Sequence, residues 1–202
     1  MTAPWSKLGW LLVVFAVVGC GGSHAYDEAL YADAARNDPR RLPYVIGVAD
    51  VVRISVWKDP SLSTDAIVRP DGTITMPLVG DLRAAGRTAA ELQQEATPRL
   101  AAFVKDAVVT VSVVEVNSYQ FTVAGAVEHP GLFNSRSYLT VSEALALAGG
   151  PSRYASTGDI VIVRTLKNGT KLRIPVDYDA ILAGRAPQQD IVILSGDAVR
   201  VP

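Results

Sequence analysis

The sequence predicts an α+β protein built from two small modules. From residue 44 onward, short stretches alternate between apolar and polar residues, as half-buried strands do. Each half of this region also contains one strong helix-start signal. The 202 residues are 49% hydrophobic and 19% charged, so the chain can bury a core and is too apolar to be disordered. We therefore expect modules at residues 44–117 and 118–202.

Composition excludes several classes of function. Nineteen Lys and Arg residues against twenty Asp and Glu residues give a formal net charge of −1, so no broad basic face for nucleic acid is expected. One cysteine permits neither an intramolecular disulfide nor a cysteine-based zinc site, and two histidines are too few for most His-rich metal sites. We expect no metal and no cofactor.

Residues 1–19 are interpreted as a lipoprotein signal peptide. Lys7 is the only charge before Asp27, and residues 8–19 form an apolar block too short to cross ~30 Å of hydrocarbon. Gly19 directly precedes Cys20, and this ending resembles the bacterial lipobox. That resemblance implies cleavage before Cys20 and acylation of its thiol and amine, each buried CH₂ contributing ~0.8 kcal/mol to anchoring. Gly21 in place of an aspartate implies the outer membrane, facing the periplasm.

The alternative for Cys20 is an ordinary buried cysteine at the end of an N-terminal helix. Its position, neighbours and uniqueness favour lipidation. Residues 20–43 are expected to form the lipidated N-terminus and a tether, because they show no sustained alternation. A short helix over residues 27–36 fits the sequence and would end before Pro39.

The first module begins with a predicted strand at residues 52–57, where valines and isoleucine alternate with polar residues and Trp57. Two further strands, residues 66–69 and 73–76, are predicted to pair as a hairpin. Its turn is formed by four residues, namely Arg69, Pro70, Asp71 and Gly72.

A helix follows, opened by the capping box of Thr88 and Glu91. Its apolar stripe is Leu92, Ala96 and Leu100. Pro98 removes an interior hydrogen bond at a cost of ~3 kcal/mol, so a kink or break is expected near Ala96. The valine-rich alternation at residues 107–116 predicts a strand that closes a ββαβ-like unit.

The second module repeats this logic. A strand at residues 121–125 and a turn at 128–131 precede a helix that a second capping box, Thr140 to Glu143, opens and Gly149 ends. Asn168-Gly169 predicts a hairpin between residues 160–166 and 171–176. A short helix at residues 178–183 and a last strand at 198–201 complete the module.

Several motifs in order resemble the polysaccharide biosynthesis/export family. Residues 44–50 have its opening pattern Tyr-x-Ile-Gly-x-x-Asp, and residues 68–80 match its central motif almost position for position. Residues 125–131, 145–150 and 194–202 are similar to a soluble-ligand-binding β-grasp domain, the SLBB domain. The resemblance covers residues 44–202.

The resemblance implies a function. Wza-type members of the family are outer-membrane lipoproteins that assemble into homo-oligomeric rings and pass capsular polysaccharide or exopolysaccharide to the cell surface. Partners implied for this chain are therefore the polysaccharide polymer, further copies of itself and an inner-membrane polysaccharide co-polymerase. Wza-type members end with an amphipathic pore helix, and nothing after Pro202 supplies one. The expectation is a short form, with a separate outer-membrane barrel as partner.

Other functions were weighed against this one. The sequence has none of the common nucleophile, phosphate-binding or dinucleotide-binding motifs, so no catalytic residue is assigned. Asp65 and Asp71 form a candidate carboxylate pair for a carbohydrate-processing enzyme, although a turn role explains Asp71 better. His24 and His129 are best explained as solvated or turn residues. The main alternative function is a periplasmic β-grasp receptor for a soluble ligand.

Sugar-stacking residues cannot be assigned from this sequence, and the ligand-binding residues are left unknown. Aromatic residues at strand positions are more often part of a core than of a binding surface. The aromatic residues concerned are Trp57, Tyr119, Phe121, Phe133 and Tyr138.

Overall fold

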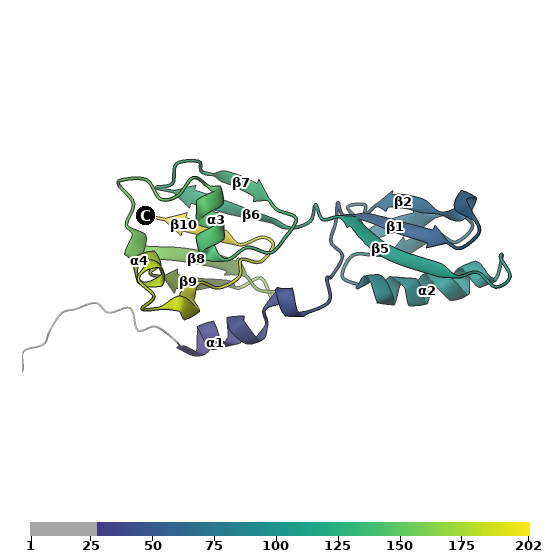
Figure 1. Ribbon diagram of the computed structural model, residues 1–202, viewed down its shortest axis with the longest axis horizontal. Helices are drawn as coiled ribbons and strands as arrows, with labels where there is room; N and C mark the ends of the chain where they lie inside the picture. Colours follow the sequence, from purple (N-terminus) through teal and green to yellow (C-terminus); the bar gives the residue numbers. More distant parts are fainter. Residues whose placement is uncertain (1–27) are drawn as a thin grey trace, which may run out of the picture.

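The computed structural model describes residues 28–202 and shows two domains placed end to end along its long axis (Figure 1). Each domain has its own cluster of buried apolar side chains, one between Ile46 and Val111 and the other mainly between Tyr119 and Val201. Both domains combine strands with helices, which confirms the predicted α+β class. Cys20 and His24 lie outside the described residues.

The first domain is organised around β1 (Val51–Val56). This strand lies between β2 (Thr64–Ile67) and β5 (Val109–Glu115), and it is antiparallel to both. The predicted alternation of β1 is confirmed, because Val52 and Ile54 are fully buried while the intervening Arg53 is exposed. Because burial alternates along β1, one face of this sheet packs against the core.

The hairpin predicted across Pro70 and Gly72 is present at its turn, where the Arg69 amide also donates to the Thr73 carbonyl at 2.9 Å. Its predicted pairing beyond that point is wrong. The Gly72 amide donates to the Arg69 carbonyl at 2.8 Å, as in a β-turn. The backbone before the turn is already paired, since Val68 exchanges hydrogen bonds with residues 49 and 50 and β2 pairs with β1. β3 (Thr73–Met76) therefore pairs with β4 (Gly80–Arg83) in a separate two-stranded sheet.

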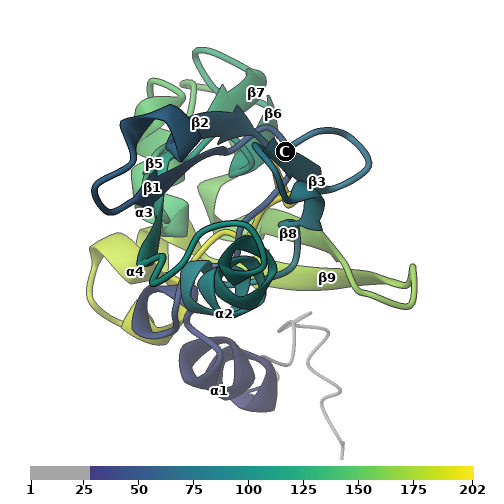
Figure 2. The same ribbon diagram turned by 90° about the vertical axis from the view of Figure 1, so that its right-hand side faces the viewer.

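α2 (Ala89–Ala101) packs against β5, and Figure 2 shows it below the strands of the first domain. The Thr88–Glu91 capping box is present as predicted. Of the kink or break predicted near Ala96, the break is wrong, because the helix continues through Pro98 to Ala101. Pro98 and Gln94, whose carbonyl loses its usual donor, are both exposed, so water can take the place of the missing hydrogen bond.

The second domain is a five-stranded sheet with the order β7-β6-β10-β8-β9. β10 is parallel to β6 and antiparallel to β8, so the last strand fills the centre between two hairpins. The predicted hairpin around Asn168 and the predicted capping box of Thr140 are both present. The strands are β6 (Gln120–Gly125), β7 (Gly131–Asn134), β8 (Ile160–Thr165), β9 (Lys171–Val176) and β10 (Ala198–Val201).

Helices cover the core side and one edge of this sheet (Figure 1). They are α1 (Glu28–Arg36), α3 (Val141–Leu147) and α4 (Tyr178–Leu182). Four short 3₁₀ turns complete the described chain, at Pro39–Arg41, Pro60–Leu62, Thr157–Asp159 and Pro187–Gln189.

α1 belongs to the second domain, although it precedes the first domain in sequence. Tyr31 is buried in the second core, and its hydroxyl donates to the Pro175 carbonyl of edge strand β9 at 2.5 Å. Pro175 also lacks an N–H, and both features protect the edge strand from unwanted pairing. From Glu28 onward, the segment expected to be a free tether is therefore folded onto the protein. The helix that the sequence allowed there is present.

Among residues 28–202, no helix is both long and apolar enough to cross a membrane.

Candidate functional site

The central motif forms a braced turn on the surface of the first domain. The Asp71 carboxylate accepts from the Thr73 amide at 3.0 Å and from the Thr73 hydroxyl at 2.6 Å. The Arg69 guanidinium donates to the same hydroxyl, to Thr75 and to Asp81. The four residues predicted as a turn thus fix how the chain enters β3.

The candidate pair of catalytic carboxylates is not supported. Asp65 forms a two-pronged ion pair with Arg53, with both contacts at 2.6 Å, whereas Asp71 belongs to the separate cluster around Arg69. Hydrogen bonds from Arg53 lower the pKa of Asp65, and those from Thr73 lower the pKa of Asp71. A glycosidase acid needs a raised pKa, so both carboxyl groups are shifted in the wrong direction for that role.

The candidate histidine is exposed, and most candidate aromatic residues pack in or beside the core. His129 is exposed, and its backbone amide donates to the Ala148 carbonyl. Tyr119 and Phe121 are buried, and Phe133 and Tyr138 pack beside them at ring-centroid distances of 5.9 Å and 5.0 Å from Phe121 and Tyr119 respectively. Trp57 departs from the expectation of a core role, because 71% of its surface is exposed.

The domain junction contains a buried carboxylate, Asp50, whose role the sequence did not indicate. Asp50 is 0% exposed and accepts from the backbone amides of Gly47, Asn117 and Ser118, each at 2.8 Å. It also accepts from the hydroxyls of Tyr44 at 2.6 Å and Ser118 at 3.1 Å. Since residues 44–47 and 117–118 run between the two domains, one carboxylate ties both connecting segments together.

The motif spacing explains this junction. Gly47 must lack a side chain, because a Cβ there would lie 2.3 Å from the side chain of Ser118. Burial and the hydrogen bond to Asp50 raise the pKa of Tyr44, so this residue stays a neutral donor. The Tyr-x-Ile-Gly-x-x-Asp motif thus supplies Tyr44, Gly47 and Asp50 to the junction. The remaining contacts come from residues 117 and 118, far along the sequence.

Asp197 has the corresponding place in the second domain. Each of the two aspartates directly precedes the central strand of its sheet, and each is buried. Asp197 accepts from the Leu194 amide at 2.8 Å and pairs with Arg164 at 2.7 Å. The residue before each aspartate has a positive φ, 74° at Ala49 and 84° at Gly196. The two domains therefore share a device for starting their central strand.

A hollow of about 440 Å³ lies at the junction, and its walls come from both domains. Tyr44 and Gly47 contribute from the first connecting segment, and Tyr138 and Ser195 from the second domain. Its shape depends on the junction that Asp50 holds. Within residues 28–202 no cluster of His, Cys, Asp and Glu has the makeup of a metal site.

Comparison with known families identifies both domains. Residues 38–114 match the model of the polysaccharide biosynthesis/export proteins. The first domain belongs to that family. Residues 120–175 match the SLBB domain, so the chain carries the two domains in the order that its motifs indicated.

Curated relatives carry the same kind of name. The EPS I polysaccharide export outer membrane protein EpsA of Ralstonia solanacearum is 30% identical over 79% of this chain and 48% of its own length. The capsule polysaccharide export protein BexD of Haemophilus influenzae is 28% identical over 76% of this chain and 42% of its own. The polysialic acid transport protein KpsD of Escherichia coli is 28% identical over 70% of this chain and 25% of its own.

The chain spans about half the length of EpsA and less of the other two relatives. All three are named for export or transport and none for catalysis.

Proposed function

We propose that this protein is a lipid-anchored, periplasm-facing component of the outer membrane that forms part of a ring through which capsular polysaccharide or exopolysaccharide leaves the cell. The observation that carries the proposal is the succession of a polysaccharide biosynthesis/export domain and an SLBB domain in one chain. Relatives named as export proteins, one of them as an outer membrane protein, support the same function.

The ring is argued from packing. Both domains have cores of fully buried side chains, such as Ile54 and Leu92 in the first and Ile162 and Leu145 in the second. Interiors packed in this way leave no passage for a sugar chain, so a conduit has to lie between copies of the protein. The polymer and an inner-membrane co-polymerase are its proposed partners.

The membrane anchor is argued from Cys20. Acyl chains on this cysteine would hold the protein at the outer membrane without a spanning segment. Cys20→Ser should abolish incorporation of labelled palmitate and release the protein from the membrane fraction. Labelling of the variant as strong as that of the wild type would refute the anchor.

The export function is tested by deleting the gene in the organism that produces the chain. Surface polysaccharide should disappear, while extracts of the deletion strain should still synthesise the polymer. Extracts that no longer synthesise it would assign the protein to synthesis instead.

Images of the detergent-extracted lipoprotein should show rings. A protein that remains monomeric, even beside its inner-membrane partner, would favour the alternative of a periplasmic β-grasp receptor.

A further inference from the structure

In the five-stranded sheet of the second domain, one face is not covered by any helix of residues 28–202. Side chains on the other face, such as Phe121, Ile162 and Val199, are buried in the core. The open face carries small or apolar side chains that are half-buried, together with the exposed arginines Arg173 and Arg200. Other exposed side chains lie toward its edges, among them Leu132 and Lys171. The half-buried members are Thr122, Ala124, Val161, Val163, Pro175 and Ala198.

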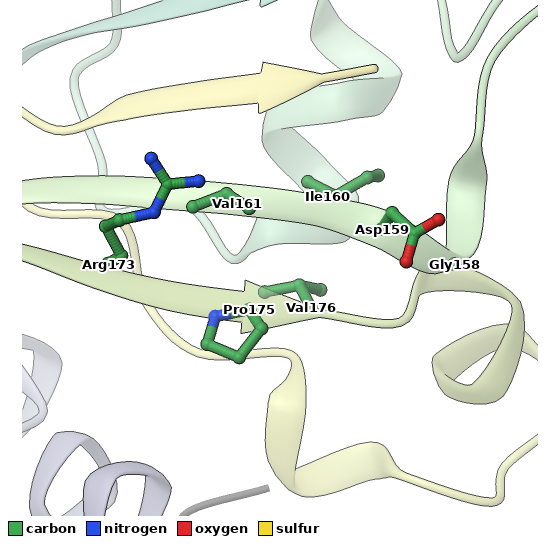
Figure 3. A pocket seen from close by; sticks show the side chains of 7 residues that line it. All are labelled: Gly158, Asp159, Ile160, Val161, Arg173, Pro175 and Val176. Atoms are coloured by element: carbon green, nitrogen blue, oxygen red, sulfur yellow. The ribbon is translucent and has the colours of Figure 1, made fainter. Parts of the chain in front are cut away.

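Two adjoining hollows mark this face. One, of about 210 Å³, is lined by Val161, Arg173 and Pro175, with Asp159 at its far end (Figure 3). The other, of about 280 Å³, is lined by Ala124, Val161 and both arginines. Val161 and Arg173 line both hollows, which therefore adjoin each other at β8.

The sheet order brings the two arginines together. In β9, Arg173 lies opposite Val163 of β8, and in β10, Arg200 lies opposite Val161 of the same strand. The arginines thus flank β8 diagonally from its two neighbours. In Figure 3 the Arg173 guanidinium extends over β8 beside Val161, and Asp159 lies at the opposite end of the first hollow.

Within residues 28–202, Arg173 and Arg200 take part in no ion pair and no side-chain hydrogen bond. By contrast, Arg53, Arg69 and Arg164 are each paired with an aspartate. Two unpaired guanidinium groups over a shared apolar floor form a positive site that the fold itself does not use.

The chemistry of the site indicates its ligand. A guanidinium group matches the two oxygens of a carboxylate, and its affinity for carboxylates is increased where aliphatic side chains exclude water. The floor of Val161, Ala124 and Pro175 offers a flat apolar surface for the C–H face of a sugar ring.

We propose that the open face of the SLBB sheet binds carboxylate-bearing sugar residues of an acidic polysaccharide, with Arg173 and Arg200 as its two anion contacts. The inference rests on the proposed export function and adds the substrate class. Several weak contacts of this kind suit a conduit, since a polymer that is held tightly could not move on.

The binding experiment uses the full-length lipoprotein in detergent and a fluorescent decamer of galacturonic acid. Its fully methyl-esterified form is the neutral control with the same backbone. The acidic decamer should bind in a salt-sensitive manner, and the ester should bind at least about tenfold more weakly. The double variant Arg173→Gln with Arg200→Gln should lose about tenfold or more in affinity for the acidic decamer.

The matched control is Arg83→Gln with Lys105→Gln, which removes the same charge from exposed positions of the first domain. It should bind like the wild type, and both double variants should keep the wild-type Tm. The proposal is overturned by an acidic decamer that fails to bind, by equal binding of the ester, or by unchanged affinity in the double arginine variant. Equal binding of a decamer of glutamate would also overturn it, as the site would then select charge without sugar.

Cell-surface measurements separate this inference from the proposed function. If deletion of the gene leaves surface polymer intact, the export function fails. If deletion abolishes surface polymer while the double arginine variant binds the acidic decamer as the wild type does, only the present inference fails.

Discussion

At the scale of single residues, Ala49 is strained and its counterpart in the second domain is not. Ala49 has a φ of 74°, whereas Gly196 occupies the corresponding place at 84°. A left-handed conformation costs an L-residue ~1–2 kcal/mol, a cost that glycine does not have. Glycine in turn lowers the stability of the fold by ~0.5–1 kcal/mol, because it increases the entropy of the unfolded chain. The two positions therefore allow a reciprocal test.

Ala49→Gly should raise the free energy of unfolding by about 0.5–1 kcal/mol. Gly196→Ala should lower it by a similar amount, because a Cβ at that position has no neighbour within 4 Å and only the backbone conformation is at stake. Urea unfolding of both variants measures the effect. A lower stability of the Ala49→Gly variant would contradict the strain argument.

Asp50 is the residue on which the domain junction depends. Asp50→Ala leaves three half-buried backbone amides, at Gly47, Asn117 and Ser118, without their acceptor. Each unsatisfied donor costs ~1–3 kcal/mol, so the variant should lose about 4 kcal/mol or more in urea unfolding. Asp71→Ala, at an exposed turn, is the control and should lose much less. A loss at Asp50→Ala as small as at Asp71→Ala would mean that water replaces the carboxylate.

At the scale of secondary-structure elements, sequence patterns predicted what local contacts determine. The capping boxes of Thr88 and Thr140 and the Asn168-Gly169 hairpin involve residues within a few positions of one another, and all three are present. β4 was missed because it has a single apolar residue, Leu82. The prediction also paired β2 with β3, whereas β2 pairs with β1. A turn motif does not determine which other strand of the sheet pairs with the residues that precede the turn.

The candidate sites show the same division. The turn at Asp71 was predictable, because its partners lie within two residues. Asp50 stands in a recognised motif, yet its partners Asn117 and Ser118 follow 67 and 68 positions later. Arg173 and Arg200 line one hollow only because β10 lies between β6 and β8 in the sheet. No local sequence pattern indicates this strand order.

The first domain should lose stability in acid through its surface carboxylates. Hydrogen bonds to Arg53, Thr73 and Arg69 lower the pKa values of Asp65, Asp71 and Asp81, respectively. A carboxyl group whose pKa is lower in the folded state stabilises the fold above its unfolded pKa of ~3.9, and this contribution is lost as the pH falls through the folded value.

The urea midpoint should therefore fall between about pH 5 and pH 3. Asp65→Asn with Asp81→Asn should make this fall shallower, because two of the linked groups no longer titrate. High salt should also flatten it, since the pairs are exposed. A midpoint with the same pH dependence in the double variant would show that other groups dominate acid unfolding.

At the scale of the whole molecule, the docking of α1 limits where the protein can lie relative to a membrane. With Cys20 lipidated as proposed, residues 21–27 are all that separate the acyl chains from Glu28. Seven extended residues reach at most ~25 Å, because each spans up to ~3.6 Å. A free segment of residues 21–43 would reach three times as far. The second domain, which holds α1 through Tyr31, should therefore remain close to the bilayer.

This geometry predicts a distance-dependent signal in vesicles with spin-labelled headgroups. Amide resonances of α1 should broaden strongly, and those of β1 and β2 in the first domain should broaden less because that domain extends away from α1 (Figure 1). Tyr31→Ala removes the buried ring and its hydrogen bond to Pro175, so α1 should detach and the second domain should move away from the headgroups. Tyr154→Phe, at an exposed tyrosine, should leave the broadening unchanged. If the second domain of the wild type broadened no more than that of the Tyr31→Ala variant, α1 would not be the element that holds the protein near its anchor.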